Sequence, residues 1–451
     1  MNKIFSIALL CSAALSFTAC VNEEDDLFDK SAAERLNEAS DLYSQRLTAS
    51  PNGWAVQLYP TKQDEAPYGT GYLLMFRFHA NKSVDASMNN ALSNNNYMTD
   101  TSTWEVITDN GPVLSFNTYN KVVHTFSDPE DVPSTGTQDT PNDETGTGIG
   151  GDYEFIIVDA PEDASYMMLK GKKRGTYNLL TPVEEGVDFE SYLADVKSFQ
   201  STMFPTSSPT FDVVHVGDAQ YKMIDFSNGV PNIYPYDGDP VMDQTFNPFL
   251  VTKRGNDYYL RFRDAKTYDD GVAVQDFKYD VEKDVFQSVD REDCYIDGDD
   301  PLRFFDQRIA TDHARLQLLY SADKSSASMK EITDAINAGL KAVNKNYSLV
   351  GLYLLYDESA AKYYLRVQYG KSNVADYEFS YTKEADGVTF AYVQPKNSVA
   401  QNVLGRVAAI QTLLNSMSTK FTVGGLTTKF NLGTEKLTST TDANFWFGMA
   451  I

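Results

Sequence analysis

Short apolar runs separated by turn residues recur along this chain, and they constrain its fold more than any other feature of the sequence. In one run the large apolar residues Leu74, Phe76 and Phe78 alternate with Met75 and Arg77. Successive side chains of a strand point to opposite faces, so this alternation predicts a strand with one buried face. Strands are predicted over residues 54–59, 71–78, 103–108, 112–117, 153–158, 166–170 and 174–180. Short strands joined by turns favour an antiparallel sheet or an open barrel.

A helix is predicted before each series of strands. Ser31 and Glu34 form a capping box, and the amphipathic segment that follows should end before Pro51. The pattern restarts at Asp188 and again at Ser328. Helices are predicted over residues 188–203, 328–344 and 399–417, and strands over 211–216, 221–226, 349–356, 362–369, 377–381, 388–393, 420–423 and 444–447. We therefore predict an α+β fold of mainly antiparallel sheet or open barrel units, each preceded by an amphipathic helix.

The order of these elements predicts the domain organisation of the 451 residues. Residues 1–19 are expected to be a signal peptide, and residues 20–30 a lipidated acidic tether. An N-terminal α+β domain should cover residues 31–185. A second α+β unit over 186–320 and a C-terminal unit over 321–451 follow, either as two domains or as one. With 42% hydrophobic residues, a chain of this length can bury several cores.

The first residues have the composition of an export signal. Lys3 precedes an apolar run that ends at Phe17, and small residues lead to Cys20. The run is shorter than the roughly 20 apolar residues that span a bilayer, and its end resembles a bacterial lipobox. We therefore expect Cys20 to be lipidated and to anchor the chain in a membrane, since each buried methylene contributes roughly 0.8 kcal/mol. The alternative is an ordinary signal peptide with an incidental cysteine.

Charge and cysteine content exclude some partners and modes of stabilisation. The formal net charge of −25 is repelled by phosphate backbones, and no basic block opposes it, so we expect no nucleic-acid partner. Of the three cysteines, one leaves with the signal peptide and one is lipidated, which leaves Cys294 alone. The folded part is therefore expected to have no disulfide, and Cys294 to be buried or incidental.

Three residues are candidates for ligand binding. His124 is the best polar candidate because it lies beside two hydroxyl side chains and Asp128, and the alternative is a histidine with a structural role. Tyr119 and Trp54 are the aromatic candidates. Such rings stack on sugars, but half-buried strands also recruit them without any ligand.

The sequence contains no recognisable catalytic constellation. Its four histidines stand at positions 79, 124, 215 and 313, outside any His-Glu-x-x-His helix. The acidic stretches at 237–239 and 297–300 lack the spacing of an EF-hand, which favours solvated turns over a calcium site. Residues 146–151 match a dinucleotide-binding pattern, but neither a preceding strand nor a following helix accompanies them. We therefore predict no catalytic residue, no metal and no cofactor, and lean against an enzyme.

A family resemblance rests on four blocks, at residues 52–54, 111–120, 124–129 and 150–155. These blocks resemble a family of Bacteroidetes lipoproteins that is defined only as a domain of unknown function. The resemblance covers most of the chain and is densest before residue 180. It implies a setting similar to that of lipoproteins encoded beside outer-membrane nutrient-uptake systems, and hence a surface accessory or binding role. It supplies no catalytic residues.

The acidic run at residues 23–26 resembles the signal that directs such lipoproteins to the outer face of the outer membrane. We therefore expect a lipid-anchored protein that faces the extracellular side and binds a nutrient or a partner protein. Expected partners are an outer-membrane transporter and a glycan or peptide ligand. The alternatives are a surface hydrolase acting through paired carboxylates and a structural adhesin. A pocket with two close carboxylates would favour the hydrolase, and an exposed aromatic cleft would favour binding.

Overall fold

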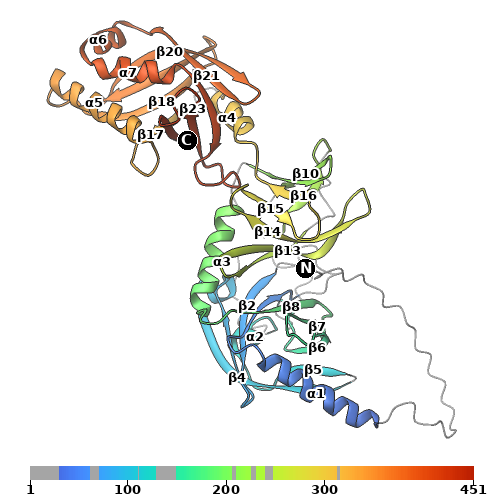
Figure 1. Ribbon diagram of the computed structural model, residues 1–451. Coiled ribbons are helices and arrows are strands. Elements are labelled where there is room, and N and C mark those ends of the chain that lie inside the picture. The colour runs from blue at the N-terminus through green and yellow to red at the C-terminus, as the bar shows by residue number, and fades with distance from the viewer. Residues whose placement is uncertain are drawn as a thin grey trace.

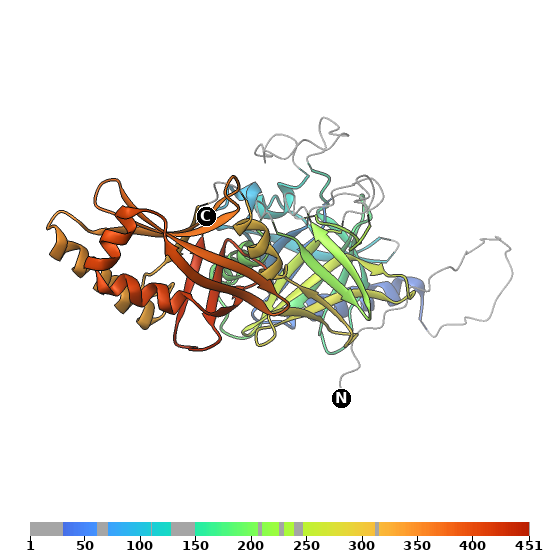
Figure 2. The same cartoon turned by 90° about the horizontal axis from the view of Figure 1, so that it is seen from above.

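Figure 1 shows a computed structural model of the chain, which describes residues 30–60, 71–109, 111–127, 149–205, 210–224, 230–238, 247–311 and 315–450. Its strands form two closed antiparallel barrels with an open antiparallel sheet between them. The predicted α+β class with sheet and barrel units is therefore confirmed. The C-terminal barrel lies at one end of the molecule in both views (Figures 1 and 2).

The N-terminal barrel closes because its last strand pairs with its first, Val56 lying opposite Leu180. Its strands are β1 (Trp54–Leu58), β2 (Tyr72–Phe78), β3 (Ser83–Met88), β4 (Met98–Thr108), β5 (Pro112–Phe116), β6 (Glu154–Asp159), β7 (Met167–Gly171) and β8 (Tyr177–Pro182). Helix α1 (Ala32–Thr48) begins at the predicted Ser31–Glu34 capping box and packs against β4 and β5. A short 3-10 helix, η1 (Ala91–Ser93), joins β3 to β4.

The barrel interior is apolar, and Trp54 is part of it. Trp54, Val56 and Leu58 belong to the interior cluster of the N-terminal barrel, whereas Ala55, from the alternate face of β1, packs in the core of the middle unit. The Trp54 ring is fully buried, and its Nε1 donates a hydrogen bond to the carbonyl of Leu47 (2.8 Å). The prediction of Trp54 as a binding residue is therefore wrong, because a ring without exposed surface cannot stack on a ligand.

The middle unit is an open sheet with the strand order β11-β10-β9-β16-β15-β14-β13-β12. Its strands are β9 (Asp212–Val216), β10 (Ala219–Ile224), β11 (Asn232–Pro235), β12 (Phe249–Arg254), β13 (Asp257–Thr267), β14 (Ala273–Asp280), β15 (Val285–Ser288) and β16 (Cys294–Asp297). Helix α3 (Phe189–Met203) starts at Asp188, whose carboxylate accepts from the Ser191 backbone N–H (2.9 Å). The helix packs in the core of this sheet, which also takes in Ala55 and Met75 of the N-terminal barrel.

The C-terminal barrel repeats the closed architecture with more helices around it. Its strands are β17 (Arg315–Leu319), β18 (Leu349–Asp357), β19 (Lys362–Tyr369), β20 (Asn373–Glu384), β21 (Gly387–Pro395), β22 (Lys420–Gly425), β23 (Thr434–Ser439) and β24 (Trp446–Ala450). Helices α4 (Pro301–Ile309), α5 (Ala327–Val343), α6 (Ser398–Arg406) and α7 (Ala408–Met417) contribute to its core. Since β17 and α4 belong to this barrel, its packing begins before residue 321; the division of residues 186–451 into domains stays a prediction.

One predicted element differs in the structure. Residues 399–417 were expected to form a single helix, but the structure has α6 and α7, which meet at Val407 with non-helical backbone angles (φ −121°, ψ 86°). Val407 is buried, and a Cβ on Gly339 of α5 would come within 2.8 Å of its side chain. The break thus lets α7 turn and pack closely against α5, a tertiary contact that local sequence does not reveal.

Candidate functional site

The predicted residues Tyr119 and His124 come together with Tyr153 at one end of the N-terminal barrel, and we call these three residues the aromatic cluster. The His124 ring lies 5.1 Å from the Tyr119 ring and 5.0 Å from the Tyr153 ring, centroid to centroid, and is nearly parallel to the latter (15°). Tyr119 is 52% exposed and Tyr153 is 46% exposed. The cluster therefore presents aromatic surface to solvent.

Asn120 holds in place the short segment that carries Tyr119 and His124. Its fully buried side chain caps helix α2 (Lys121–His124), accepting from the backbone N–H groups of Val122 (3.0 Å) and Val123 (3.2 Å). The amide nitrogen of the same side chain donates to the Ser102 hydroxyl of β4 (3.0 Å). This short helix, which propensity alone would not stabilise, is thereby attached to the barrel wall.

The backbone that carries Tyr153 is also held. The carbonyl of Tyr153 accepts from the backbone N–H of Phe116 (3.1 Å), where β5 and β6 approach each other. The preceding residue, Asp152, is buried and accepts from the backbone N–H groups of Lys173 and Arg174 (both 2.9 Å). Burial raises the pKa of the Asp152 carboxyl, and these hydrogen bonds oppose the shift. Hydrogen bonds thus hold the backbone that carries the exposed rings of the cluster.

The chemistry of the aromatic cluster is that of stacking and hydrogen bonding. Nδ1 of His124 lies 3.1 Å from the backbone nitrogen and 3.2 Å from the carbonyl oxygen of Asn120, so it accepts from the N–H or donates to the carbonyl according to the tautomer of the ring. A nucleophilic triad requires a hydroxyl hydrogen-bonded to the histidine that serves as its base. Here Nδ1 of His124 faces the main chain of Asn120. The cluster is therefore suited to binding planar or ring-shaped groups.

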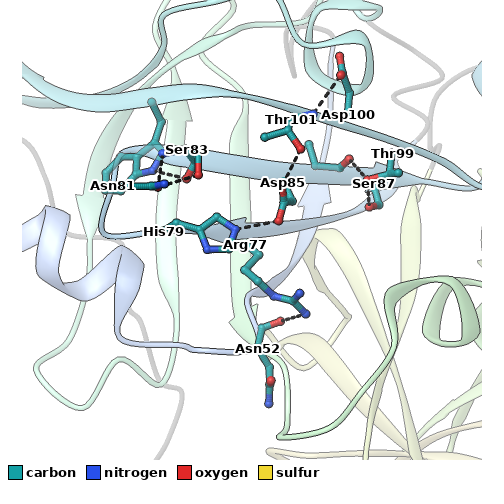
Figure 3. A network of polar contacts seen from close by, with 12 residues as sticks. Asn52, Arg77, His79, Asn81, Ser83, Asp85, Ser87, Thr99, Asp100 and Thr101 are labelled. Carbon is teal, nitrogen blue, oxygen red and sulfur yellow. Dashed lines mark hydrogen bonds and ion pairs between the residues drawn. The ribbon is translucent and has the colours of Figure 1, made fainter.

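A second polar network lies on the outer face of β2, β3 and β4 (Figure 3). Asp85 accepts from the Thr101 hydroxyl (2.7 Å) and lies 2.8 Å from Nε2 of His79. Burial raises the pKa of Asp85, but these two hydrogen bonds outweigh it, so the pKa lies below its ordinary value. In a hydrolytic triad the histidine lies between hydroxyl and carboxylate, whereas here the carboxylate takes the middle position. The network therefore lacks the contact between hydroxyl and histidine that defines such a triad.

A cavity of about 170 Å³ lies between α3 and the turn that joins β12 to β13. Its lining includes Glu184, Asp188, Asp195 and Lys253. Asp188 caps α3, and its hydrogen bonds to Ser191 lower its pKa; Asp195 forms an ion pair with Lys253. A glycosidase needs an acid whose pKa is raised beside a second carboxylate. The pKa of Asp188 is lowered rather than raised, and Asp195 is taken up by Lys253, so this cavity does not favour the hydrolase.

The other residues singled out in the sequence lie elsewhere in the structure or outside its described ranges. Within the described ranges, no group of three or more His, Cys, Asp and Glu side chains is arranged to hold a metal ion. Cys294 is buried in β16, and burial raises the pKa of its thiol to about 12, far from a reactive thiolate. Cys20, His313 and the predicted loop at 129–147 lie outside the described residues. None of the helices that the structure describes is long and apolar enough to cross a bilayer.

The sequence pointed to Tyr119 and His124 but missed Tyr153 as their partner. Tyr153 is 29 positions beyond His124 in the sequence, and the pairing of β5 with β6 brings it back to the cluster, with Ser115 opposite Glu154. The available signal was that Tyr153 lies in one of the four blocks that carry the family resemblance.

The fold and the cluster define a protein of antiparallel barrel units with an exposed aromatic site on the N-terminal barrel. The chain belongs to the family described as "Domain of unknown function (DUF4302)", whose model matches residues 24–281, more than half of the chain. The matched region contains the whole N-terminal barrel and most of the middle sheet. No curated protein has a sequence that matches this chain.

Solved structures offer only distant likenesses. The beta subunit of DNA polymerase from Streptococcus pyogenes is 9% identical, with 91% of this chain and 96% of that chain covered and a TM-score of 0.13. The isotype 1 transferrin binding protein B from serogroup B Neisseria meningitidis is 8% identical, with 89% and 68% covered and a TM-score of 0.13. TM-scores this low carry no argument about fold or function.

Proposed function

We propose that this protein is a lipid-anchored binding protein of the bacterial outer surface, an accessory that holds a nutrient or partner molecule without transforming it. The observation that carries the proposal is the exposed aromatic cluster. Two half-exposed tyrosine rings flank a histidine on a backbone held by hydrogen bonds, and this arrangement provides stacking surface.

A glycan is the ligand that this chemistry fits best. The apolar face of a sugar ring packs on an aromatic ring, while sugar hydroxyls exchange hydrogen bonds with phenol and imidazole groups. Tyrosine offers this contact at a low entropic cost because its side chain has few rotatable bonds. Asn120 and Asp152 hold the backbone beneath the rings, so little ordering is needed when a ligand arrives.

The anchor is the second part of the proposal. Cys20 follows an export signal, and the acidic residues 23–26 lie between it and helix α1. Lipidation of Cys20 would therefore attach the folded units through a short solvated tether. Cys20→Ala should move the protein from the membrane fraction to the soluble fraction. If the variant remains in the membrane fraction after a high-salt wash, the lipid anchor is wrong.

Binding is tested with the purified chain against a panel of glycans and peptides. We expect a glycan to bind, and the double variant Tyr119→Ala/Tyr153→Ala to weaken its affinity about tenfold or more, since each stacked ring is worth roughly 0.5–1.5 kcal/mol beyond its burial. Tyr177→Ala is the matched control, because Tyr177 is 38% exposed on β8 of the same barrel but lies outside the cluster.

Two outcomes would contradict the binding proposal. One is a bound ligand whose affinity is the same for the wild type and for a folded double variant. The other is turnover of a polysaccharide or peptide that a single Asp or His substitution abolishes, which would establish a hydrolase instead.

A further inference from the structure

A loop of the C-terminal barrel inserts into the middle sheet, and we call residues 426–432, between β22 and β23, the docking loop. Phe430 of this loop is 1% exposed and belongs to the core of the middle unit, with its ring 5.5 Å from Phe286 and 6.0 Å from Phe204. The backbone of Lys429 passes so close to Gly298 that a Cβ there would clash. The chain itself crosses this junction at residues 298–300, between β16 and α4. The docking loop is therefore a second link between the two units.

Carboxylates of the middle sheet hold the docking loop. Asp284, in the turn between β14 and β15, accepts from the Thr428 hydroxyl (2.8 Å) and from the backbone N–H of Lys429 (2.9 Å). The Lys429 ammonium forms an ion pair with Asp297 of β16. The attachment therefore depends on the charge balance of a small, largely buried region.

A further carboxyl, Asp212 of β9, lies in the same region without a balancing partner. Asp212 is 2% exposed, and within the described part of the chain its Oδ2 has no hydrogen-bond partner. Asp284, Asp297 and Asp299 all act on it electrostatically. Burial is the first cause that raises the pKa of Asp212 well above its ordinary value, and the three neighbouring carboxylates add to it.

The other charged and titratable groups of this region interact with partners other than Asp212. Asp299 is held by the Arg303 guanidinium of α4, and the Tyr279 hydroxyl donates to Asp284 (2.8 Å). His215 of β9 lies on the outer face with Tyr295, where Asp297 and Lys429 act on it in opposite directions. Among the described residues, Lys429 and Arg303 pair with Asp297 and Asp299, two of the aspartates that act on Asp212, and Lys222 lies over the ring of the adjacent Phe211.

We propose that Asp212 makes the docking loop a proton-controlled latch. With Asp212 neutral, the loop stays docked and the C-terminal barrel is fixed to the middle sheet. Ionisation of Asp212 adds a further buried negative charge to the region where aspartates hold the loop, and the loop leaves the sheet. The C-terminal barrel then keeps its chain connection at residues 298–300 and loses the contacts of the docking loop. This inference does not depend on the ligand-binding proposal.

The shifted pKa of Asp212 determines how docking of the loop depends on pH. Release of the loop would let water reach Asp212 and return its pKa toward the ordinary value, so the docked state, in which burial raises the pKa, binds the proton more tightly. Docking is therefore strongest at low pH and weakens as the pH rises through the docked-state pKa of Asp212. The latch opens toward alkaline pH.

Trypsin tests the latch in the full-length chain, because the bond after Lys429 is buried while the loop is docked. Short trypsin pulses at a series of pH values from 6 to about 9.5 should cut after Lys429 at least about tenfold faster at the alkaline end, the factor that one pKa unit of linkage corresponds to. Cleavage after the exposed Lys345 corrects for the pH dependence of trypsin itself. Exchange of the Lys429 backbone amide, corrected for intrinsic rates, should show the same dependence.

Asp212→Asn should remove the pH dependence, and Asp212→Ser serves if asparagine does not fit the site. Asp290→Asn is the matched control, because burial also raises the pKa of Asp290 in the same unit, although it makes none of the docking contacts. It should behave as the wild type does. A normalised cleavage rate that does not change with pH overturns the latch, and so does an unchanged pH dependence in a folded Asp212 variant.

Discussion

The two closed barrels of this chain have the same strand order but different interiors. In the N-terminal barrel, the inward positions of β1 hold Trp54, Val56 and Leu58, and the interior is aromatic and aliphatic. In the C-terminal barrel, Glu435 lies on the same inward-facing side of β23 as the core residue Leu437 and pairs with Arg308 of α4. The inward side of β1 is therefore apolar, whereas that of β23 contributes to a buried ion pair.

Some N–H groups of this ion pair have no hydrogen-bond partner among the described residues, and this limits what the pair contributes to stability. Nη1 of Arg308 donates to both carboxylate oxygens of Glu435 (2.8 Å each), while Nε and Nη2 of the same guanidinium are buried and have no partner among the described residues. Burial therefore raises the pKa of Glu435 to about 7, although Arg308 opposes the shift. Such a pair adds little net stability but is costly to break. The comparison teaches that equal topology does not imply equal sensitivity to charge.

The largest effect is expected when the ion pair loses one partner. Glu435→Ala should destabilise the C-terminal barrel by about 3–5 kcal/mol at pH 8, because the Arg308 cation stays buried without a counter-charge. Region-resolved hydrogen exchange should show faster exchange in β23 and unchanged exchange in β2. The double variant Arg308→Met/Glu435→Leu is the control and should be close to wild-type stability. A single variant as stable as the double variant would show that the pair is not energetically coupled.

The next largest effect is a pH dependence confined to the C-terminal barrel. Glu435 binds its proton more tightly in the folded state, so its contribution is fully present below the unfolded pKa of about 4.5 and is lost as the pH rises through about 7. The shift corresponds to roughly 3 kcal/mol between these values. Exchange-derived opening free energies of β23 should fall accordingly from pH 5 to pH 8. The Arg308→Met/Glu435→Leu variant should lack this decrease, and a decrease that persists in it would assign the effect to another group.

Packing in the N-terminal barrel should give a smaller, pH-independent effect. Trp54→Phe leaves a gap in the interior and removes the hydrogen bond to the Leu47 carbonyl, so we expect a loss of about 2 kcal/mol. Trp446→Phe in β24 is the control, because Trp446 is only partly buried. Urea unfolding followed by far-UV circular dichroism measures both. Equal losses for the two variants would contradict the assignment of Trp54 to the barrel interior.

Sequence periodicity predicted the elements better than it predicted their closure. Residues 71–78 alternate clearly and form β2, and the capping box at Ser31 starts α1 as predicted. Barrel closure depends on β1 pairing with β8, more than a hundred residues later, and alternation within one strand contains no information about such a partner. The strands between Phe249 and Asp297 were not predicted, because charged side chains on the exposed face of β13 obscure the pattern.

The candidate site was predictable only in part for the same reason. His124 and Tyr119 are five positions apart in the sequence, but Tyr153 joins them through the pairing of β5 with β6. In the sequence, Trp54 looked as suitable for binding as Tyr119. Only the structure shows that the Trp54 side chain lies in the barrel interior, whereas Tyr119 is exposed. Arg308 and Glu435 are 127 residues apart, so their pairing has no local signal.

The smallest predicted effect compares a matching feature of the two barrels, the asparagine that caps a helix. Asn120 caps α2 and is fully buried with a further bond to Ser102, whereas Asn397 caps α6 through one bond to the Ala400 N–H and is exposed. Asn120→Ala should cost about 1–2 kcal/mol, and Asn397→Ala about 0.5–1 kcal/mol.

The two cap variants also differ in what they should do to ligand binding. Loss of the Asn120 side chain weakens the attachment of α2 to β4, which keeps the bond from the Lys121 N–H to Asp100, and so loosens the position of His124 in the aromatic cluster. Glycan affinity should therefore fall at temperatures where the barrel is still folded. Asn397→Ala should leave affinity unchanged, because α6 belongs to the other barrel. Titration calorimetry beside thermal unfolding separates the two effects. If Asn120→Ala lowers stability and leaves affinity at the wild-type value, ordered backbone beneath the rings is not what the site requires.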